Sequence, residues 1–177
     1  MGSGFTLKCR KCGYEVSGNL GVGFLFPKVH LETMEAARAG EYGETIRQFL
    51  EDHPDGVLNT ENVFLQCTGC GELAFGQDLS MYVRNKDVKR KEHGRWSVAI
   101  PFEGSDYVSP MELDRENTYE FVAWGNVCAK CGKPMKPISE DNLLCKKNSY
   151  GEIGEQTVLD CPKCREPLFI AERLMWD

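Results

Sequence analysis

The sequence predicts an α+β protein made of two small β modules, each closed around a four-cysteine metal site, with a short helical insertion in the first module. Three observations support this fold class. Eight of the nine cysteines fall into Cys-x-x-Cys pairs, apolar segments of strand length lead into or out of each pair, and two helix-type segments separate the first two pairs. The pairs are Cys9 and Cys12, Cys67 and Cys70, Cys128 and Cys131, and Cys161 and Cys164.

The spacing of the cysteines indicates metal binding. Two thiolates separated by two residues can hold one side of a tetrahedral ion, which leaves two positions for a second pair. Four pairs therefore predict two closed sites. Gly13, Gly71 and Gly132 directly follow three of the pairs, where a tight turn favours a residue that is free to take positive φ, and Arg165 follows the fourth. The four-thiolate ligand sets favour two structural zinc ions per chain, with iron as the alternative metal.

Three ways of sharing the pairs between two metals are conceivable. Loop-closure entropy favours pairing in sequence order over a nested arrangement by only about 1 to 2 kcal/mol. Consecutive elements tend to be spatial neighbours, so we expect the first pair to join the second and the third to join the fourth. This pairing predicts an N-terminal zinc-ribbon-like domain over residues 1–103, with the helical insertion, and a C-terminal one over residues 104–177.

The elements of the N-terminal half follow in order. Residues 5–16 alternate in polarity through the first pair and predict a ribbon hairpin, and residues 18–27 predict a buried apolar strand or loop. Residues 31–39 favour a short helix ended by Gly40, and residues 45–52 favour a second helix with Ile46, Phe49 and Leu50 on one face. Residues 31–62 hold eight acidic and two basic side chains, which is typical of a solvated helix face.

The middle of the chain alternates between strands and a polar loop. Residues 63–65 predict a strand into the second pair, and residues 73–83 carry apolar side chains out of it. Residues 84–95 hold six basic and two acidic side chains, and residues 96–102 predict another strand, so residues 91–95 are expected at a hairpin tip.

The C-terminal half begins with a capped helix. Ser109 is expected as its N-cap, with Pro110 in the first turn and Glu112 closing a capping box. Strand segments at residues 119–124, 157–159 and 168–170 then flank the last two pairs and predict the second ribbon, with a loop at residues 148–154. Cys145, the unpaired cysteine, is expected as a small apolar core residue, with a reactive thiol as the alternative.

Charge and composition restrict the class of partner. The formal net charge is -6, and two zinc ions with eight thiolates bring it to about -10, which argues against a general nucleic-acid binder. Lysines and arginines crowd the cysteine pairs, where they offset thiolate charge. Paired cysteines without a leader segment indicate a reducing, cytoplasmic setting, and no apolar stretch is long enough to span a membrane.

Two families with catalytic or redox sites share part of this cysteine pattern. A rubredoxin-like iron carrier uses the same ligands, but Gly-Lys-Pro-Met after Cys131 lacks the aromatic features expected of that family. A zinc deaminase has His-x-Glu before Pro-Cys-x-x-Cys, which His30 and Glu32 imitate, but Gln66 stands at the proline position. We therefore expect no enzyme, and surface positions for His53 and His93.

The segments CRKCGY, LGVGFLFP, AGEYGETI, CTGCG and CAKCGKPM together resemble a group of uncharacterised bacterial proteins with multiple zinc-ribbon (CxxC) motifs. The resemblance covers most of the chain, and its specific part is the cysteine motifs. It implies metal binding in a bacterial cytoplasm and assigns no activity.

These observations favour a zinc-binding, two-ribbon interaction module whose partner is a protein, held through the ribbon surfaces or the acidic insertion. The alternatives are a rubredoxin-like iron electron carrier and a ribbon that contacts nucleic acid through residues 84–95. The sequence sets no oligomeric state.

Overall fold

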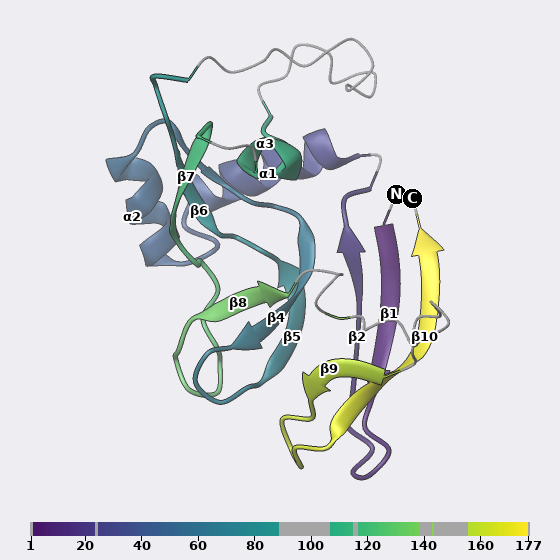
Figure 1. The fold of residues 1–177 in the computed structure, drawn as a ribbon. Helices are drawn as coiled ribbons and strands as arrows, with labels where there is room; N and C mark the ends of the chain where they lie inside the picture. Colours follow the sequence, from purple (N-terminus) through teal and green to yellow (C-terminus); the bar gives the residue numbers. More distant parts are fainter. Residues whose placement is uncertain are drawn as a thin grey trace. The chain divides into compact units, whose positions relative to one another are not determined.

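The computed structural model describes residues 2–23, 25–88, 107–114, 117–138, 143 and 156–176. They form a mixed, mostly β structure with a few short helices and curled antiparallel sheets (Figure 1). The helices are α1 (Phe26–Arg38), α2 (Glu44–Asp52) and α3 (Pro110–Leu113). The strands are β1 (Gly2–Lys8), β2 (Glu15–Gly21), β3 (Gly56–Leu58), β4 (Asn62–Cys67), β5 (Leu73–Gln77), β6 (Met81–Arg84), β7 (Tyr119–Ala123), β8 (Met135–Ile138), β9 (Gln156–Asp160) and β10 (Pro167–Trp176).

The larger sheet joins the two ends of the chain. Its strand order is β5-β4-β2-β1-β10-β9, with β8 paired to β4. Strand β1 pairs antiparallel with β10 from Gly2 opposite Trp176 to Lys8 opposite Phe169, and the termini lie side by side in Figure 1. The first and last strands are therefore neighbours in space.

A second sheet has three strands in the order β3-β6-β7. Side chains of α1, α2, β3 and β6 form one apolar core beside it, which includes Ala37, Ile46 and Leu58. The separate core of the larger sheet includes Leu7, Phe64 and Leu168. Each sheet thus has its own buried apolar cluster.

The chain divides into two compact units, both discontinuous in sequence. Unit 1 comprises residues 1–23, 62–76 and 127–177, and unit 2 comprises residues 24–61 and 77–126. Neither set of limits follows the expected division between residues 103 and 104. The mixed, mostly β composition agrees with the expected fold class at this coarse level.

The helices agree well with the sequence pattern. Helix α2 buries Ile46, Phe49 and Leu50 as expected, and the Ser109–Glu112 capping box of α3 is present. Helix α1 starts earlier than expected, at Phe26, because Pro27 fits the first turn, where its missing N–H costs nothing. None of the described helices is long and apolar enough to cross a membrane.

Two strand assignments need correction. The apolar run at residues 73–83 is two strands, β5 and β6, which lie in different sheets, and Leu79 between them has a positive φ of 53°. Strand β7 pairs with β6 and not with the C-terminal strands, so residues 119–124 are not part of a C-terminal ribbon. The expected strand at residues 96–102, the hairpin tip at 91–95, the loop at 148–154 and Cys145 lie outside the described residues.

Candidate metal centres

The eight paired cysteines meet in two groups, both inside unit 1. Cluster 1 consists of Cys9, Cys12, Cys161 and Cys164, and cluster 2 consists of Cys67, Cys70, Cys128 and Cys131. Within each cluster all sulfur atoms lie within 4.8 Å of one another. The shortest separations between pairs are 3.4 Å for Cys9–Cys164, 3.5 Å for Cys12–Cys161, 3.3 Å for Cys67–Cys131 and 3.7 Å for Cys70–Cys128.

The pairing in sequence order is wrong, because the structure nests one cluster inside the other. Pairing of β1 with β10 brings the first cysteine pair to the last, and pairing of β4 with β8 brings the second pair to the third. The entropic preference for sequence order, about 1 to 2 kcal/mol, is small beside the strand pairing that opposes it. Long-range sheet contacts therefore decide which cysteines meet.

The sulfur geometry fits a tetrahedral metal ion in each cluster. A disulfide needs sulfurs about 2.05 Å apart, which these separations exceed, and the structure holds all eight as free thiols. Four sulfurs placed about 2.3 Å from a central zinc lie about 3.8 Å from one another. The shortest separations between pairs, 3.3 to 3.7 Å, are slightly below that value, and all sulfurs of a cluster lie within 4.8 Å of one another. Four-thiolate sets accept zinc or iron.

One backbone turn recurs at all four pairs. At the first pair, the N–H of Cys9 donates to the Tyr14 carbonyl at 2.8 Å and the N–H of Gly13 donates to the Cys9 carbonyl at 3.1 Å. The same two bonds occur in the turns that begin at Cys67, Cys128 and Cys161. The residue after each second cysteine has positive φ in every case: 69° at Gly13, 74° at Gly71, 68° at Gly132 and 64° at Arg165. The expectation of positive φ is confirmed at the three glycines, and Arg165, which departs from the glycine pattern in the sequence, adopts the same conformation.

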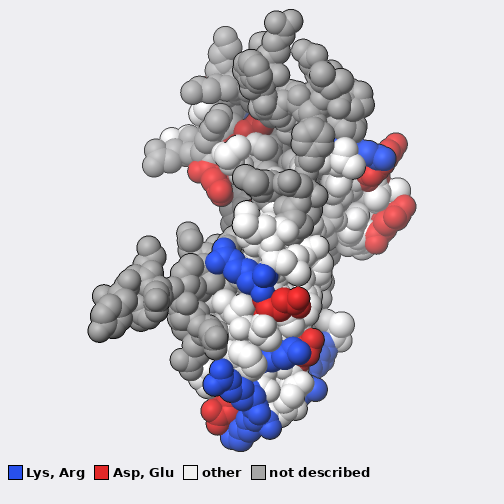
Figure 2. All heavy atoms as spheres, turned by 90° about the vertical axis from the view of Figure 1, so that its right-hand side faces the viewer, with Lys and Arg blue, Asp and Glu red and all other residues white. Residues whose placement is uncertain are grey.

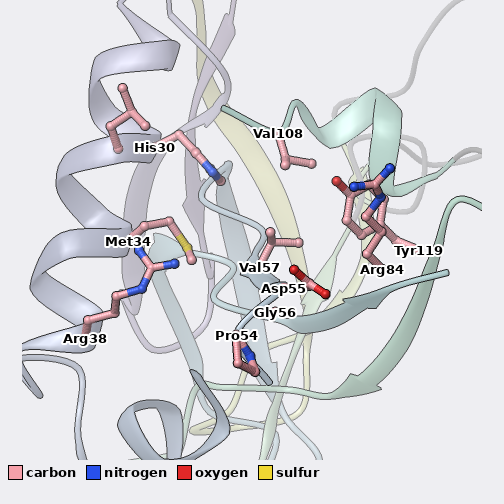
Figure 3. A pocket seen from close by; sticks show the side chains of 11 residues that line it. His30, Met34, Arg38, Pro54, Asp55, Gly56, Val57, Arg84, Val108 and Tyr119 are labelled. Carbon is pink, nitrogen blue, oxygen red and sulfur yellow. The ribbon is translucent and has the colours of Figure 1, made fainter. Parts of the chain in front are cut away.

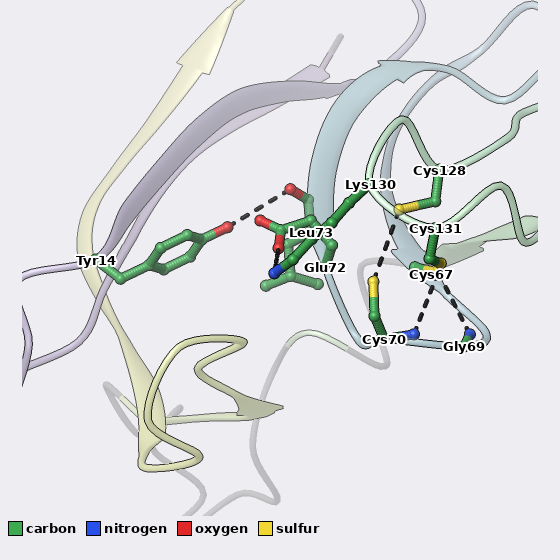
Figure 4. A network of polar contacts seen from close by, with 9 residues as sticks. All are labelled: Tyr14, Cys67, Gly69, Cys70, Glu72, Leu73, Cys128, Lys130 and Cys131. Carbon is green, nitrogen blue, oxygen red and sulfur yellow. Dashed lines mark hydrogen bonds and ion pairs between the residues drawn. The ribbon is translucent and has the colours of Figure 1, made fainter.

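Backbone N–H groups stabilise a thiolate at the first cysteine of two pairs. The N–H groups of Cys70 and Gly69 lie 3.4 and 3.3 Å from the Cys67 sulfur (Figure 4). The Cys70 N–H bond is the largest cause that lowers the pKa of Cys67 to about 6. In cluster 1, the N–H of Cys12 likewise lowers the pKa of Cys9 to about 7. Each cluster therefore has one cysteine poised to bind metal as a thiolate at neutral pH.

The partner thiols titrate in the opposite direction. The backbone N–H of Glu72 favours the Cys70 thiolate, but burial and the hydrogen bonds with Cys67, Cys131 and Cys128 outweigh it and raise the pKa of Cys70 to about 11. The same balance, with Glu166 as the donor, raises the pKa of Cys164 to about 12. Four thiolates repel one another at these distances, so full ionisation requires a cation among them.

The turns of the two clusters contact each other within unit 1. The Tyr14 hydroxyl donates to the Leu73 carbonyl at 3.5 Å, and Lys130 pairs with Glu72 at 3.1 Å across cluster 2 (Figure 4). Burial, followed by the charge of Glu72, raises the pKa of Tyr14 to about 12. A Cβ added at Gly71 would lie 3.1 Å from the Arg165 guanidinium. Residues that follow a cysteine pair in one cluster thus lie against the turn of the other.

Several lysines near the clusters interact with a neighbouring acidic or aromatic side chain. Salt bridges join Lys8 to Glu15 and Lys11 to Glu166, both at 2.9 Å, while Lys163 lies over the Tyr14 ring. In Figure 2, lysines and arginines gather at the lower end of the molecule with acidic side chains among them.

His30 and His53 belong to unit 2 and are members of neither sulfur cluster. His30 is buried in α1, with Nδ1 3.3 Å from the Thr60 hydroxyl. Cys67 and Cys70 already belong to a complete four-sulfur set, which leaves no role for His30 of the deaminase type. His53 is exposed after α2, as expected, with its ring against Phe49. His93 lies outside the described residues.

No protein-family model, no curated protein and no solved structure matches this chain.

Proposed function

We propose that the chain is a zinc-binding protein with two nested zinc-ribbon-like modules, which presents its surface to another protein in the bacterial cytoplasm. The outer module holds one zinc ion in cluster 1, and the inner module holds another in cluster 2. One observation carries the proposal: eight cysteine sulfurs lie in two sets of four at separations that suit tetrahedral metal.

The role of the metal in this proposal is structural. Each cluster offers four protein ligands, so a bound tetrahedral ion keeps no open position for water or substrate. Cluster 1 would fasten the β1–β2 hairpin to the β9–β10 hairpin, and cluster 2 would fasten β4–β5 to the turn before β8. Metal binding then supplies folding free energy to small β units.

A protein partner suits the surface better than nucleic acid does. The chain is acidic, and several cations near the clusters already have acidic partners. Large apolar side chains are exposed in unit 1, where Val127, Leu174 and Met175 are 64%, 47% and 76% accessible. Apolar and Met side chains of this kind are enriched in the centres of protein interfaces.

Metal analysis tests the first half of the proposal. Protein purified without added metal should contain two zinc ions per chain and show no visible absorption band, because zinc has a filled d shell. Iron bound to the same thiolates would give visible absorption and would support the electron carrier instead. One metal ion per chain would contradict the proposal.

Capture of a partner from a native lysate tests the second half. We expect the zinc-loaded chain to retain a protein, and a Leu174→Asp, Met175→Asp double variant to lose it. A Glu35→Gln, Glu41→Gln variant, which alters exposed acidic positions near the C-terminal end of α1, should retain it. Loss only in the acidic-position variant would assign the interface to the helical insertion, and recovery of nucleic acid alone would overturn the protein-partner proposal.

A further inference from the structure

Unit 2 contains a pocket with a volume of about 190 Å³ (Figure 3). It lies between α1, the turn that leads into β3, and the ends of β6 and β7. The volume is below the roughly 300 Å³ at which ligand pockets usually begin, so the pocket suits a ligand of a few carbon atoms.

Arg84 brings an unsatisfied donor to this pocket. It is the last residue of β6, opposite Tyr119 of β7. Its Nε atom is buried and finds no hydrogen-bond acceptor among the described residues. Buried polar atoms in native proteins nearly always have a partner, and a charged guanidinium has the greatest need of one. A bound acceptor would satisfy it.

The acidic side chain in the pocket is paired with a lysine. The Asp55 carboxylate accepts from Lys86 Nζ at 2.9 Å, and the charge of Arg84 also attracts it without forming a salt bridge. Among the described residues, no salt bridge joins Arg84 or Arg38 to an acidic group. The pocket therefore has an excess of positive charge, in a chain whose net charge is -6.

Two further side chains of α1 reach the same space. Arg38 lies in the last turn of the helix, and Figure 3 shows it across the pocket from Arg84. The His30 ring, which is only 2% exposed, also points into the pocket. Met34, Val57 and Val108 supply apolar lining. The walls therefore combine hydrogen-bond donors with a surface for a short carbon skeleton.

We propose that this pocket binds a small organic oxyanion, a carboxylate or a phosphate monoester, whose charged oxygens contact Arg84 and Arg38. Planar guanidinium groups match the geometry of both oxyanions and hold them through paired N–H donors. The apolar lining takes the ligand's carbon atoms and favours an organic anion over inorganic phosphate. The site is separate from the sulfur clusters, so it does not depend on the identity of the metal.

The test uses the metal-loaded full chain and amide NMR spectra. Isobutyrate, methyl phosphate and inorganic phosphate are titrated separately, with isobutyramide as a neutral molecule of the same shape as isobutyrate. We expect isobutyrate or methyl phosphate to shift the resonances of Val57 and Tyr119, with a dissociation constant of about 1 mM, and isobutyramide to shift neither. Whichever of the two organic anions binds more tightly defines the oxyanion.

Variants connect the binding to the two arginines. Arg84→Gln and Arg38→Gln should each raise the dissociation constant about tenfold, because each removes a charge-assisted contact. Arg47→Gln is the matched control, since Arg47 lies on α2 and pairs with Glu44 and Glu51, and it should leave binding unchanged. Arg38 is exposed, so its variant keeps the test valid if Arg84→Gln fails to fold. Equal binding of isobutyrate and isobutyramide, tighter binding of inorganic phosphate than of both organic anions, or no shift with any anion, would overturn the proposal.

Discussion

Arg165 adopts a backbone conformation that favours glycine. Its φ is 64°, in the left-handed region, where the Cβ of an ordinary residue crowds the following carbonyl. Gly13, Gly71 and Gly132 have the same conformation at the equivalent position of the other three turns. The turn around each cysteine pair thus requires a positive φ at this position, even where the residue is not glycine.

Substitution at these positions should change stability in opposite directions. Gly132→Ala should destabilise the metal-loaded protein by about 1 kcal/mol, because a Cβ there meets no neighbouring atom and only backbone strain is added. Arg165→Gly should stabilise it by less than about 1 kcal/mol, since relief of strain is partly offset by the flexibility of glycine in the unfolded chain. Thermal and denaturant unfolding measure both. Gly76→Ala is the control, because Gly76 is absent from the positive-φ positions and a Cβ there would only touch Leu65 at 4.0 Å. A destabilisation as large in Gly76→Ala would contradict the strain argument.

Glu61 should make folding depend on pH. Burial, followed by the charges of Asp78 and Asp114, raises the pKa of its carboxyl above the ordinary value of 4.5. The folded state then binds this proton more tightly than the unfolded state, so stability falls as pH rises from about 4.5 through the raised value. Glu61→Gln should raise the unfolding midpoint at pH 7, and its advantage should shrink as the pH approaches 4.5.

The pKa of Glu44, which also lies in unit 2, is shifted in the opposite direction. A hydrogen bond from Arg47 lowers the pKa of Glu44, so its ionised form is favoured in the folded state. Glu44→Gln should therefore give no gain in stability at pH 7. Unfolding curves of both variants across pH, with a carbon-detected NMR titration of Glu61, measure the effect. A Glu61 pKa at or below 4.5 would contradict the predicted pH dependence.

At the scale of elements, strand pairing determines which cysteines share a metal. The β1–β2 and β9–β10 hairpins each carry one half of cluster 1, and β4–β5 with β8 carries cluster 2. Each half-site is complete within a local turn, and the two halves of cluster 1 are brought together by the pairing of β1 with β10 and by the Lys11–Glu166 salt bridge. Which cysteines share a metal site therefore shows which strands are paired.

Pairs of cysteine substitutions distinguish the nested arrangement from pairing in sequence order. A Cys12→Ser, Cys164→Ser variant should retain one metal ion per chain, because both changes fall in cluster 1. A Cys12→Ser, Cys67→Ser variant should retain none, because it damages both clusters. Sequence-order pairing predicts the reverse for the two variants. Metal content after gel filtration decides between them, and a Cys12→Ser single variant, which should keep one ion, is the control.

Across the whole molecule, neither the N-terminal nor the C-terminal part of the chain forms a complete unit by itself. Unit 1 takes residues from both termini and from the middle, and unit 2 is built from the two segments between them. The terminal strands pair with each other, so the fold closes only after the last strand has been made. Such long-range contacts carry a high loop-closure cost and slow folding.

Two fragments test whether folding requires both ends of the chain. The pieces 1–103 and 104–177 each hold one half of both clusters, so neither alone should give a dispersed amide spectrum with zinc present. Mixed together with zinc, they should assemble and give the spectrum of the intact chain with two metal ions per complex. Half-sites can take up metal loosely, so the spectrum and not the metal content is the deciding measurement. An independently folded 104–177 fragment would contradict the nested topology.

The sequence alone determined the local features of this protein. Cys-x-x-Cys spacing located all eight sulfurs, the glycine after three of the pairs indicated the positive-φ turn, and the polarity pattern placed α2 and the α3 cap. These features depend on residues within about one turn of each other, where steric and capping rules act directly. Three features became known from the three-dimensional structure alone: the pairing of the cysteines, the division of residues 73–83 between two sheets, and the placement of Arg38 and Arg84 around one pocket. Those outcomes depend on many weak contacts between distant strands, whose sum outweighs the entropic preference of about 1 to 2 kcal/mol for neighbours in sequence.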